Sequence, residues 1–118
     1  MSDDPFRPLA SEADWADAQS RSEEQPVLLF KHSAACPVSG SANEEMRTLA
    51  ADSDLPVYKL VVQESRALSD EIADTLGVRH ETPQAILLEE EAPVFNTSHF
   101  DVTAETLREA LQSVTLSP

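Results

Sequence analysis

The sequence predicts a single α/β domain built on a four-stranded mixed β-sheet with helices on both faces. A chain of 118 residues is long enough for one hydrophobic core and too short for two. Short apolar runs of strand length alternate with longer segments whose apolar residues recur every three or four positions. The connection between the last two strands is so short that it can only join antiparallel neighbours, so the sheet must be mixed.

The N-terminal part is predicted to contain a tail, a helix and a central strand. Residues 1–8 hold two prolines among charged side chains, which predicts a flexible tail before a domain over residues 9–118. Ser11 is a typical helix N-cap, and Asp14 follows three residues later as an acidic variant of the capping box. The unbroken apolar run Val27–Phe30 is typical of a strand that is covered on both faces.

A helical crossover to a second strand is predicted next. Pro37 fits the first turn of a helix, where its missing N–H leaves no hydrogen bond unmade. The inward-facing positions of this helix are Met46, Leu49 and Ala50. Val57–Val62 is rich in valine and is predicted to be a strand parallel to the first, because a helical crossover returns the chain in the same direction.

The C-terminal half adds a helix, a hairpin and a final helix. Ser65 opens a helix with apolar residues four positions apart, and Gly77 closes it as a left-handed cap. Gln84–Leu88 and Val94–Phe95 are strands separated only by an acidic turn and Ala-Pro, which predicts a hairpin. The last helix begins at Thr103. The order α-β-α-β-α-β-β-α leaves no residues for further βα units and indicates a thioredoxin-like architecture.

The charge balance is strongly acidic. Acidic residues outnumber basic ones by 22 to 8, and the formal net charge is −14. Such a surface repels phosphate backbones and anionic lipids, which argues against nucleic acid or a membrane as a partner. Only Lys31 and Lys59 are lysines. Acid-rich, lysine-poor surfaces suit a cytoplasm of high salt, where screening relieves self-repulsion.

Cysteine usage and the N-terminus predict a cytoplasmic protein. The chain has one cysteine and cannot form an internal disulfide, as expected in a reducing compartment. Met1–Pro5 is acidic and lacks the basic start and apolar segment of a secretory signal. The longest apolar runs are far too short to cross a bilayer. One cysteine and three scattered histidines lack the spacing of a metal site, so no metal is expected.

The single cysteine, Cys36, is the candidate nucleophile. It follows the first core strand and precedes the predicted helix that begins at Pro37, and sites in open α/β sheets lie at this edge. The unpaired N–H groups and partial positive charge of a helix N-terminus favour thiolate over thiol. Lys31 and His32, just upstream, can add positive field. An unpaired cysteine can equally be a small buried hydrophobic residue, and position alone does not separate these two interpretations.

Ser39 occupies the position where dithiol oxidoreductases carry a second cysteine. A serine cannot resolve a mixed disulfide, so a catalytic cycle must be reset by an outside thiol. The protein is therefore monothiol. Ser39 can donate a hydrogen bond to the Cys36 thiolate, or simply occupy the surface of the first helical turn.

Three segments resemble the monothiol bacilliredoxin family: Phe30–Ser39 (FKHSAACPVS), Val78–Gln84 (VRHETPQ) and the dipeptide Ser98–His99. The resemblance covers roughly residues 9–114, and the three motifs occur in the family's order. It implies a thioredoxin fold and the removal of bacillithiol, a low-molecular-weight thiol, from modified cysteines of client proteins. Cys36 would attack the mixed disulfide and retain bacillithiol, and free bacillithiol would regenerate the enzyme.

The resemblance also implies where substrates bind. Thr82–Pro83 matches the proline opposite the reactive cysteine, which is cis in thioredoxin folds and would turn the Thr82 backbone toward the mixed disulfide. No bound cofactor is expected, because bacillithiol is a co-substrate. With Cys36 as the catalytic residue, the residues expected at the substrate site are Lys31, His32, Ser33, Pro37, Ser39, Thr82, Pro83 and His99.

Two other functions are compatible with the sequence. A cysteine without a resolving partner also suits a non-catalytic thioredoxin-like binding module or redox sensor. A third alternative is a monothiol glutaredoxin-like carrier of an iron–sulfur cluster, although the basic glutathione contacts of that group are not evident. His80 is, like His99, a candidate for lining the groove, but lone histidines in loops are more often surface residues.

Overall fold

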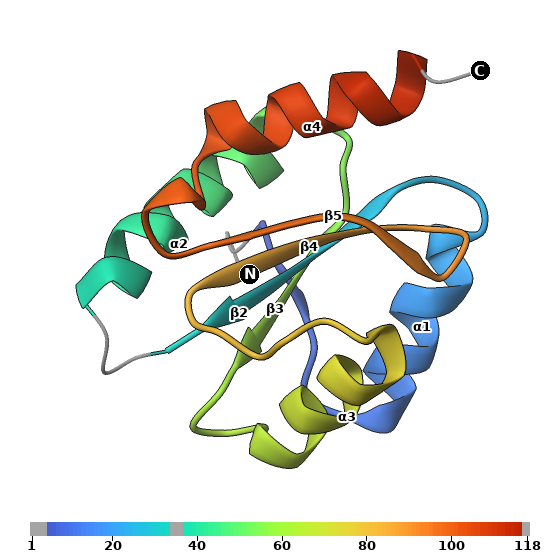
Figure 1. Cartoon of the computed structure of the whole chain (residues 1–118), viewed down its shortest axis with the longest axis vertical. Coiled ribbons are helices and arrows are strands. Elements are labelled where there is room, and N and C mark those ends of the chain that lie inside the picture. The colour runs from blue at the N-terminus through green and yellow to red at the C-terminus, as the bar shows by residue number, and fades with distance from the viewer. Residues whose placement is uncertain (1–4, 34–36, 117–118) are drawn as a thin grey trace.

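The computed structural model describes residues 5–33 and 37–116, with the side chains of residues 37–39 and 114–116 left undescribed. Its centre is a mixed sheet with the strand order β1-β3-β2-β4-β5 (Figure 1). β2 (Val27–His32) lies in the middle, parallel to β3 (Val57–Val61) and antiparallel to β4 (Gln84–Glu89). β5 (Ala92–Ser98) pairs with β4 in the opposite direction. The predicted parallel crossover and hairpin are both confirmed.

The sheet has five strands and not the four predicted. The additional strand, β1 (Arg7–Pro8), runs parallel to β3 at one edge, and the N–H of Leu9 donates to the carbonyl of Lys59 at 3.0 Å. Phe6, just before β1, is 8% exposed. Residues 6–8 therefore belong to the fold, although they were expected within the flexible tail. A two-residue strand that ends in proline has no alternating pattern, and proline is tolerated at a sheet edge.

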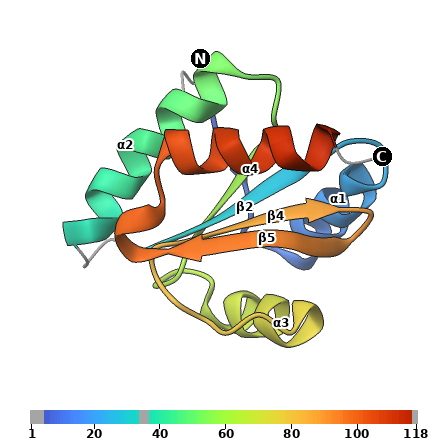
Figure 2. The same ribbon diagram turned by 45° about the horizontal axis from the view of Figure 1, so that its top comes forward.

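Four helices cover the two faces of the sheet (Figure 2). α2 (Pro37–Asp52) and α4 (Ala104–Leu116) lie over one face, and α1 (Glu12–Ser22) and α3 (Arg66–Leu76) lie over the other. The chain order places helices alternately on the two sides, as expected for a thioredoxin-like fold. The sheet is thus buried on both faces, which explains the unbroken apolar sequence of β2.

Each face of the sheet packs into its own hydrophobic cluster, because successive strand residues point to opposite sides. On the α2/α4 side the strands contribute residues such as Leu28, Phe30, Val57, Ala85 and Leu87. On the α1/α3 side they contribute Val27, Leu29, Tyr58, Leu60, Ile86 and Leu88. The expected inward positions of α2, Met46 and Leu49, are fully buried.

The predicted helix ends are formed as expected. Ser11 Oγ accepts from the N–H of Asp14 at 3.1 Å, and Asp14 Oδ2 accepts from the N–H of Ala10 at 2.9 Å. Gly77 closes α3 in the left-handed conformation, with φ 66°. α2 begins at Pro37. None of the helices in the described part of the chain has the length and apolarity needed to cross a membrane.

Candidate active site

The candidate site lies where β2 ends and α2 begins. β2 ends at His32 and α2 begins at Pro37, so the sequence between them contains Cys36. Cys36 itself lies outside the described residues, and so do the side chains of Pro37 and Ser39. The geometry of the site is consequently built from the residues on either side of this connection and from the segments that flank it.

Lys31 and His32 point to opposite faces of the sheet. His32 shares a face with Phe30, whose ring centroid is 5.8 Å from that of the imidazole, and this is the face covered by α2. Lys31 shares the other face with α3, and its Nζ donates to the carbonyl of Ser69 at 3.0 Å. Of the two side chains expected to add positive field near Cys36, only His32 is therefore on the face of the sheet that α2 covers.

Lys31 is almost completely buried, with 1% of its surface exposed. Burial lowers its pKa from the ordinary 10.5 to about 8, because an ammonium loses hydration in the protein interior, while Asp70 acts in the opposite direction. A side chain at this depth cannot contact a substrate directly. The expectation that Lys31 is a substrate-binding residue is thus corrected: its contacts are within the fold.

Ser33 lies at the start of the connection toward Cys36. Its side chain is half-buried, and its Oγ accepts a hydrogen bond of 2.8 Å from Nε2 of Gln63. Gln63 follows β3, the strand next to β2. The carboxyl ends of the two parallel strands are thus joined by side chains at the edge of the sheet where the site is expected.

Thr82 and Pro83 precede β4 on the other side of the expected groove. The peptide bond between them is cis, as the family resemblance implied. Pro83 is buried and Thr82 is half-buried. The carbonyl of Pro83 accepts a hydrogen bond of 2.9 Å from the N–H of His99. Two of the three sequence motifs therefore meet here, although they are far apart in the chain.

Glu81 strengthens this junction with its carboxylate. Ser98 Oγ donates to Glu81 Oε2 at 3.1 Å, and His99 Nε2 lies 3.3 Å from Glu81 Oε1. The hydrogen bond from Ser98, followed by that from His99, lowers the pKa of Glu81. Glu81 therefore links the Val78–Gln84 motif to the end of β5 in its ionised form, as a carboxylate that accepts these hydrogen bonds.

A residue missed by the sequence analysis is Phe100. It belongs to the short helix η1 (His99–Asp101), which contacts α2, and it is 82% exposed. His99, before it, has φ 58°, a left-handed conformation that is uncommon for a non-glycine residue. The conformation of His99 carries the chain out of β5 while its N–H stays bonded to Pro83. An exposed aromatic ring so close to the motifs gives no periodic signal in the sequence.

His80, a candidate for lining the groove and more simply a surface residue, is half-buried. Its Nδ1 lies 3.3 Å from Nζ of Lys31 and 3.2 Å from Oγ of Ser69. Burial and then the positive charge of Lys31 lower the pKa of His80. The contact joins a loop residue to a core strand 49 positions earlier in the sequence, so local sequence patterns do not reveal it.

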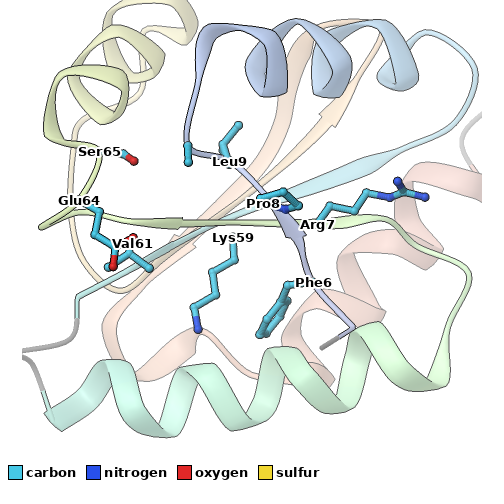
Figure 3. A pocket seen from close by; sticks show the side chains of 9 residues that line it. Phe6, Arg7, Pro8, Leu9, Lys59, Val61, Glu64 and Ser65 are labelled. Atoms are coloured by element: carbon cyan, nitrogen blue, oxygen red, sulfur yellow. The ribbon is translucent and has the colours of Figure 1, made fainter. Parts of the chain in front are cut away.

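A surface hollow of about 370 Å³ lies at the β1 edge, and Figure 3 shows its Phe6 and Lys59 side by side, both pointing from the sheet toward α2. Nζ of Lys59 is 5.1 Å from the centre of the Phe6 ring. None of the predicted site residues lines this hollow. Within the described residues, no three His, Cys, Asp or Glu side chains converge in a way that could hold a metal ion.

The fold, the cysteine that directly precedes α2 in the sequence and the cis Thr82–Pro83 bond before β4 are those of a thiol redox protein with a thioredoxin fold. A family model described as monothiol bacilliredoxin BrxC matches residues 7–107. The chain therefore belongs to the monothiol bacilliredoxin family.

Solved structures share the fold. A putative oxidoreductase with a thioredoxin fold is 34% identical over 87% of this chain and 90% of its own, with a TM-score of 0.78. A mutant thioredoxin from Halobacterium salinarum NRC-1 is 22% identical over 100% and 99% of the two chains, with a TM-score of 0.78. The short form of spinach chloroplast thioredoxin f is 20% identical, covers 93% of each chain and has a TM-score of 0.74. The last two similarities concern the fold alone.

Proposed function

We propose that this protein is a monothiol thiol–disulfide oxidoreductase that removes bacillithiol, or a similar low-molecular-weight thiol, from mixed disulfides on cytoplasmic client proteins. One observation carries the proposal: the only cysteine of the chain directly precedes the first residue of a 16-residue helix in a thioredoxin fold. The free N–H groups of a helix's first turn and its partial positive charge favour the thiolate, which is the attacking species.

The proposed cycle has two thiol–disulfide exchanges. The Cys36 thiolate attacks the bacillithiol sulfur of the client's mixed disulfide, a disulfide forms between Cys36 and bacillithiol, and the client sulfur leaves as a thiolate that takes a proton from water. A second bacillithiol, also as thiolate, attacks the adduct, restores Cys36 and leaves as bacillithiol disulfide. The two exchanges together convert the client's mixed disulfide and one bacillithiol into a free client thiol and bacillithiol disulfide, and no bound cofactor takes part. Ser39 has no sulfur with which to resolve the adduct internally.

The surface formed by the Thr82–Pro83 segment and the end of β5 is suited to a protein substrate. The segment with Thr82 and Pro83, the end of β5 and the short helix η1 are held together by the Pro83–His99 and Glu81–Ser98 hydrogen bonds. Phe100 presents an aromatic ring to solvent at this place. A client whose modified cysteine is flanked by apolar residues can bury that ring, which supports the choice of a protein as substrate over a small disulfide.

The test is an adduct measurement. A bacillithiolated client protein is mixed with the wild-type chain and with Cys36→Ser, and intact masses are recorded over time. We expect the client to lose bacillithiol while the wild-type chain gains it on Cys36, and no transfer to the variant. Absence of an adduct on wild-type Cys36 would contradict the proposal.

Turnover separates the enzyme from a redox sensor. With excess bacillithiol and a reductase that regenerates it, an enzyme processes many client molecules per chain, whereas a sensor accepts one thiol and stops. Titration of the thiolate by its ultraviolet absorbance, with Cys36→Ser as blank, gives the second criterion. We expect a pKa below the value of about 8.5 that a free cysteine has.

A further inference from the structure

Lys31 is the one residue of β2 whose side chain places a charge in the core. Of the six strand residues, Val27–Phe30 are apolar and His32 lies at the end, while Lys31 is 1% exposed among the apolar residues of the α1/α3 face. Burying an ammonium is unfavourable unless its hydrogen bonds are replaced. The proposed exchange chemistry does not use this charge directly, so the presence of an ammonium in the core needs another explanation.

The partners of Lys31 come from two different segments. Its Nζ donates to the carbonyl of Ser69 in α3 at 3.0 Å and lies 3.3 Å from Nδ1 of His80. Ser69 Oγ is 3.2 Å from the same ring nitrogen. Gln84, which stands opposite Lys31 in the β2–β4 ladder, adds a hydrogen bond of 2.8 Å from its Nε2 to the carbonyl of Arg79. The loop around His80 is thereby attached to the buried side of the sheet.

The protonation states of the pair follow from hydrogen-bond chemistry. An ammonium only donates, so Nδ1 of His80 must accept, and the proton of a neutral imidazole must then be on Nε2. A charged imidazole has no acceptor and would oppose the ammonium. The pair therefore carries one positive charge, which is on Lys31, while His80 is neutral. Burial lowers the pKa of both groups, to about 8 for Lys31, which fits a charged lysine beside a neutral histidine near pH 7.

The contact joins the two segments that flank the proposed nucleophile. Lys31 lies five residues before Cys36, and His80 lies two residues before Thr82. We propose that Lys31 is a positioning residue: its ammonium, hydrogen-bonded to α3 and to His80, fixes the Thr82–Pro83 segment against the strand that leads to Cys36. The inference rests on the proposed function for its catalytic consequence, whereas the proton arrangement can be tested without any activity.

Several charged groups around the pair set its pH dependence. Asp70 on α3 favours charge on both Lys31 and His80, Arg66 on the same helix disfavours charge on His80, and Glu81 in the loop favours it. Above about pH 8 the ammonium of Lys31 loses its proton and a charge-assisted hydrogen bond becomes a weaker neutral one. The attachment of the loop should therefore loosen as the solution becomes more alkaline.

The structural test uses NMR of the full chain labelled with ¹⁵N-histidine. We expect His80 of the wild type to show a protonated Nε2 and an unprotonated, hydrogen-bonded Nδ1 at pH 7. Lys31→Met should shift the Nδ1 signal and the backbone amides of Thr82 and Gln84. Lys59→Met is the matched control, because it removes the only other lysine, on the opposite face of the sheet, and should leave these signals unchanged. A wild-type Nδ1 that carries the proton would overturn the inference.

The catalytic test compares His80→Leu, which removes the acceptor, with His80→Asn, whose side-chain oxygen can accept a hydrogen bond but does not titrate. Misplacement of a positioning group costs about 10- to 100-fold in rate. We expect His80→Leu to reduce kcat/KM for a bacillithiolated client by at least tenfold, and His80→Asn to restore it to within about threefold of the wild type. A His80→Leu enzyme as active as the wild type would contradict the inference.

A second rate separates positioning from a general loss of structure or of nucleophilicity. Alkylation of Cys36 by iodoacetamide depends on the thiolate and not on Thr82–Pro83. We compare the rate constant for reaction of Cys36 with the bacillithiolated client with that for its alkylation. In the wild type this ratio should fall above about pH 8, because Lys31 loses its charge. In Lys31→Met the ratio should be independent of pH. An equal loss of both rates, or the same pH profile in both proteins, would contradict the inference. If the wild type forms no Cys36 adduct, the proposed function fails, and the NMR result still decides the proton arrangement.

Discussion

At the scale of single residues, the site shows how strand alternation separates neighbours. Lys31 and His32 are adjacent in the chain, yet the imidazole packs near Phe30 on the α2 side while the ammonium hydrogen-bonds to Ser69 under α3. The sequence alone places both near Cys36 but cannot tell which one faces the helix that follows it. The alternation of β2 decides this: His32 lies on the side of α2, and Lys31 lies on the side of α3.

The buried ammonium of Lys31 predicts a specific dependence of stability on pH. Its pKa is about 8 in the folded chain and about 10.5 when unfolded, so between these values the unfolded state binds more protons and the free energy of unfolding rises with pH. Below about pH 8 the penalty is constant, at roughly 3 kcal/mol. Lys31→Met removes the penalty and should be at least as stable as the wild type at pH 7.

Urea unfolding of both proteins at pH 7, 8, 9 and 10 measures this effect. The stability difference between Lys31→Met and the wild type should shrink as the pH rises, because only the wild type gains from deprotonation of Lys31. Other groups that titrate at alkaline pH, Tyr58 among them, are common to both proteins and cancel in the difference. A difference that does not vary with pH would show that Lys31 is not a buried cation.

Phe100 is predicted to contribute to client binding and hardly at all to folding. Its ring is 82% exposed, so Phe100→Ala removes little buried apolar surface and should change stability by less than about 0.5 kcal/mol. Loss of a contact with the client should raise KM for a bacillithiolated protein several-fold. The same variant should form the Cys36–bacillithiol adduct from bacillithiol disulfide at the wild-type rate, because that substrate is too small to reach the ring. Equal effects on the two substrates would contradict a role in client recognition.

At the scale of secondary-structure elements, the β4–β5 hairpin has an unusual turn. Its central residues, Glu90 and Glu91, have φ values of 54° and 64°, the geometry of a type I′ turn that normally carries Asn-Gly. The turn is attached to the end of α1: the N–H of Glu90 donates to the carbonyl of Ser22 at 2.8 Å, and the N–H of Glu91 to Ser22 Oγ at 2.9 Å. Packing against α1 thus holds two glutamates in a conformation that they adopt reluctantly.

Replacing this turn with its preferred residues should stabilise the fold. The double substitution Glu90→Asn and Glu91→Gly keeps both backbone donors to Ser22 and keeps the left-handed backbone, but lowers its cost, which is about 1–2 kcal/mol per residue for most other side chains. After the entropy cost of glycine we expect a net gain of about 1 kcal/mol in unfolding free energy, measured by urea denaturation. The matched control, Glu90→Gln and Glu91→Gln, removes the same two charges without relieving the backbone. If the control gains as much, the benefit comes from charge and not from conformation.

The elements also show where sequence-based prediction succeeds. The strand Val27–Phe30, the cap at Ser11 and the left-handed Gly77 have strong local signals, and each is found where it was predicted. β1 was missed because two residues at a sheet edge are ordered by pairing with β3, which is distant in sequence. The same reason applies to His80, whose partners are Lys31 and Ser69. The features that sequence patterns did not reveal are those that depend on tertiary contacts.

At the scale of the whole molecule, the dominant feature is the net charge of −14, carried by 22 acidic and 8 basic residues. The side chains in the ion pairs of Arg21 with Asp17 and of Arg108 with Asp52 are 31–63% exposed, and pairs this accessible to water contribute little. Self-repulsion among the carboxylates therefore opposes the compact state. At an ionic strength of 0.1 M this repulsion acts over about 10 Å, and at 1 M over about 3 Å.

The folded state should consequently become more stable as KCl is raised from 0.1 to 1 M, with thermal unfolding shifted upward by several degrees. Screening has to be separated from a general effect of solutes, so a variant with Glu44→Gln, Glu64→Gln and Glu109→Gln serves as the control; all three side chains are exposed. Neutralising them weakens the repulsion that salt would otherwise screen. The variant should be more stable than the wild type at 0.1 M KCl and gain less from added salt. A wild-type midpoint that does not change with KCl, or an equal gain in both proteins, would show that charge repulsion does not limit the stability of this acidic fold.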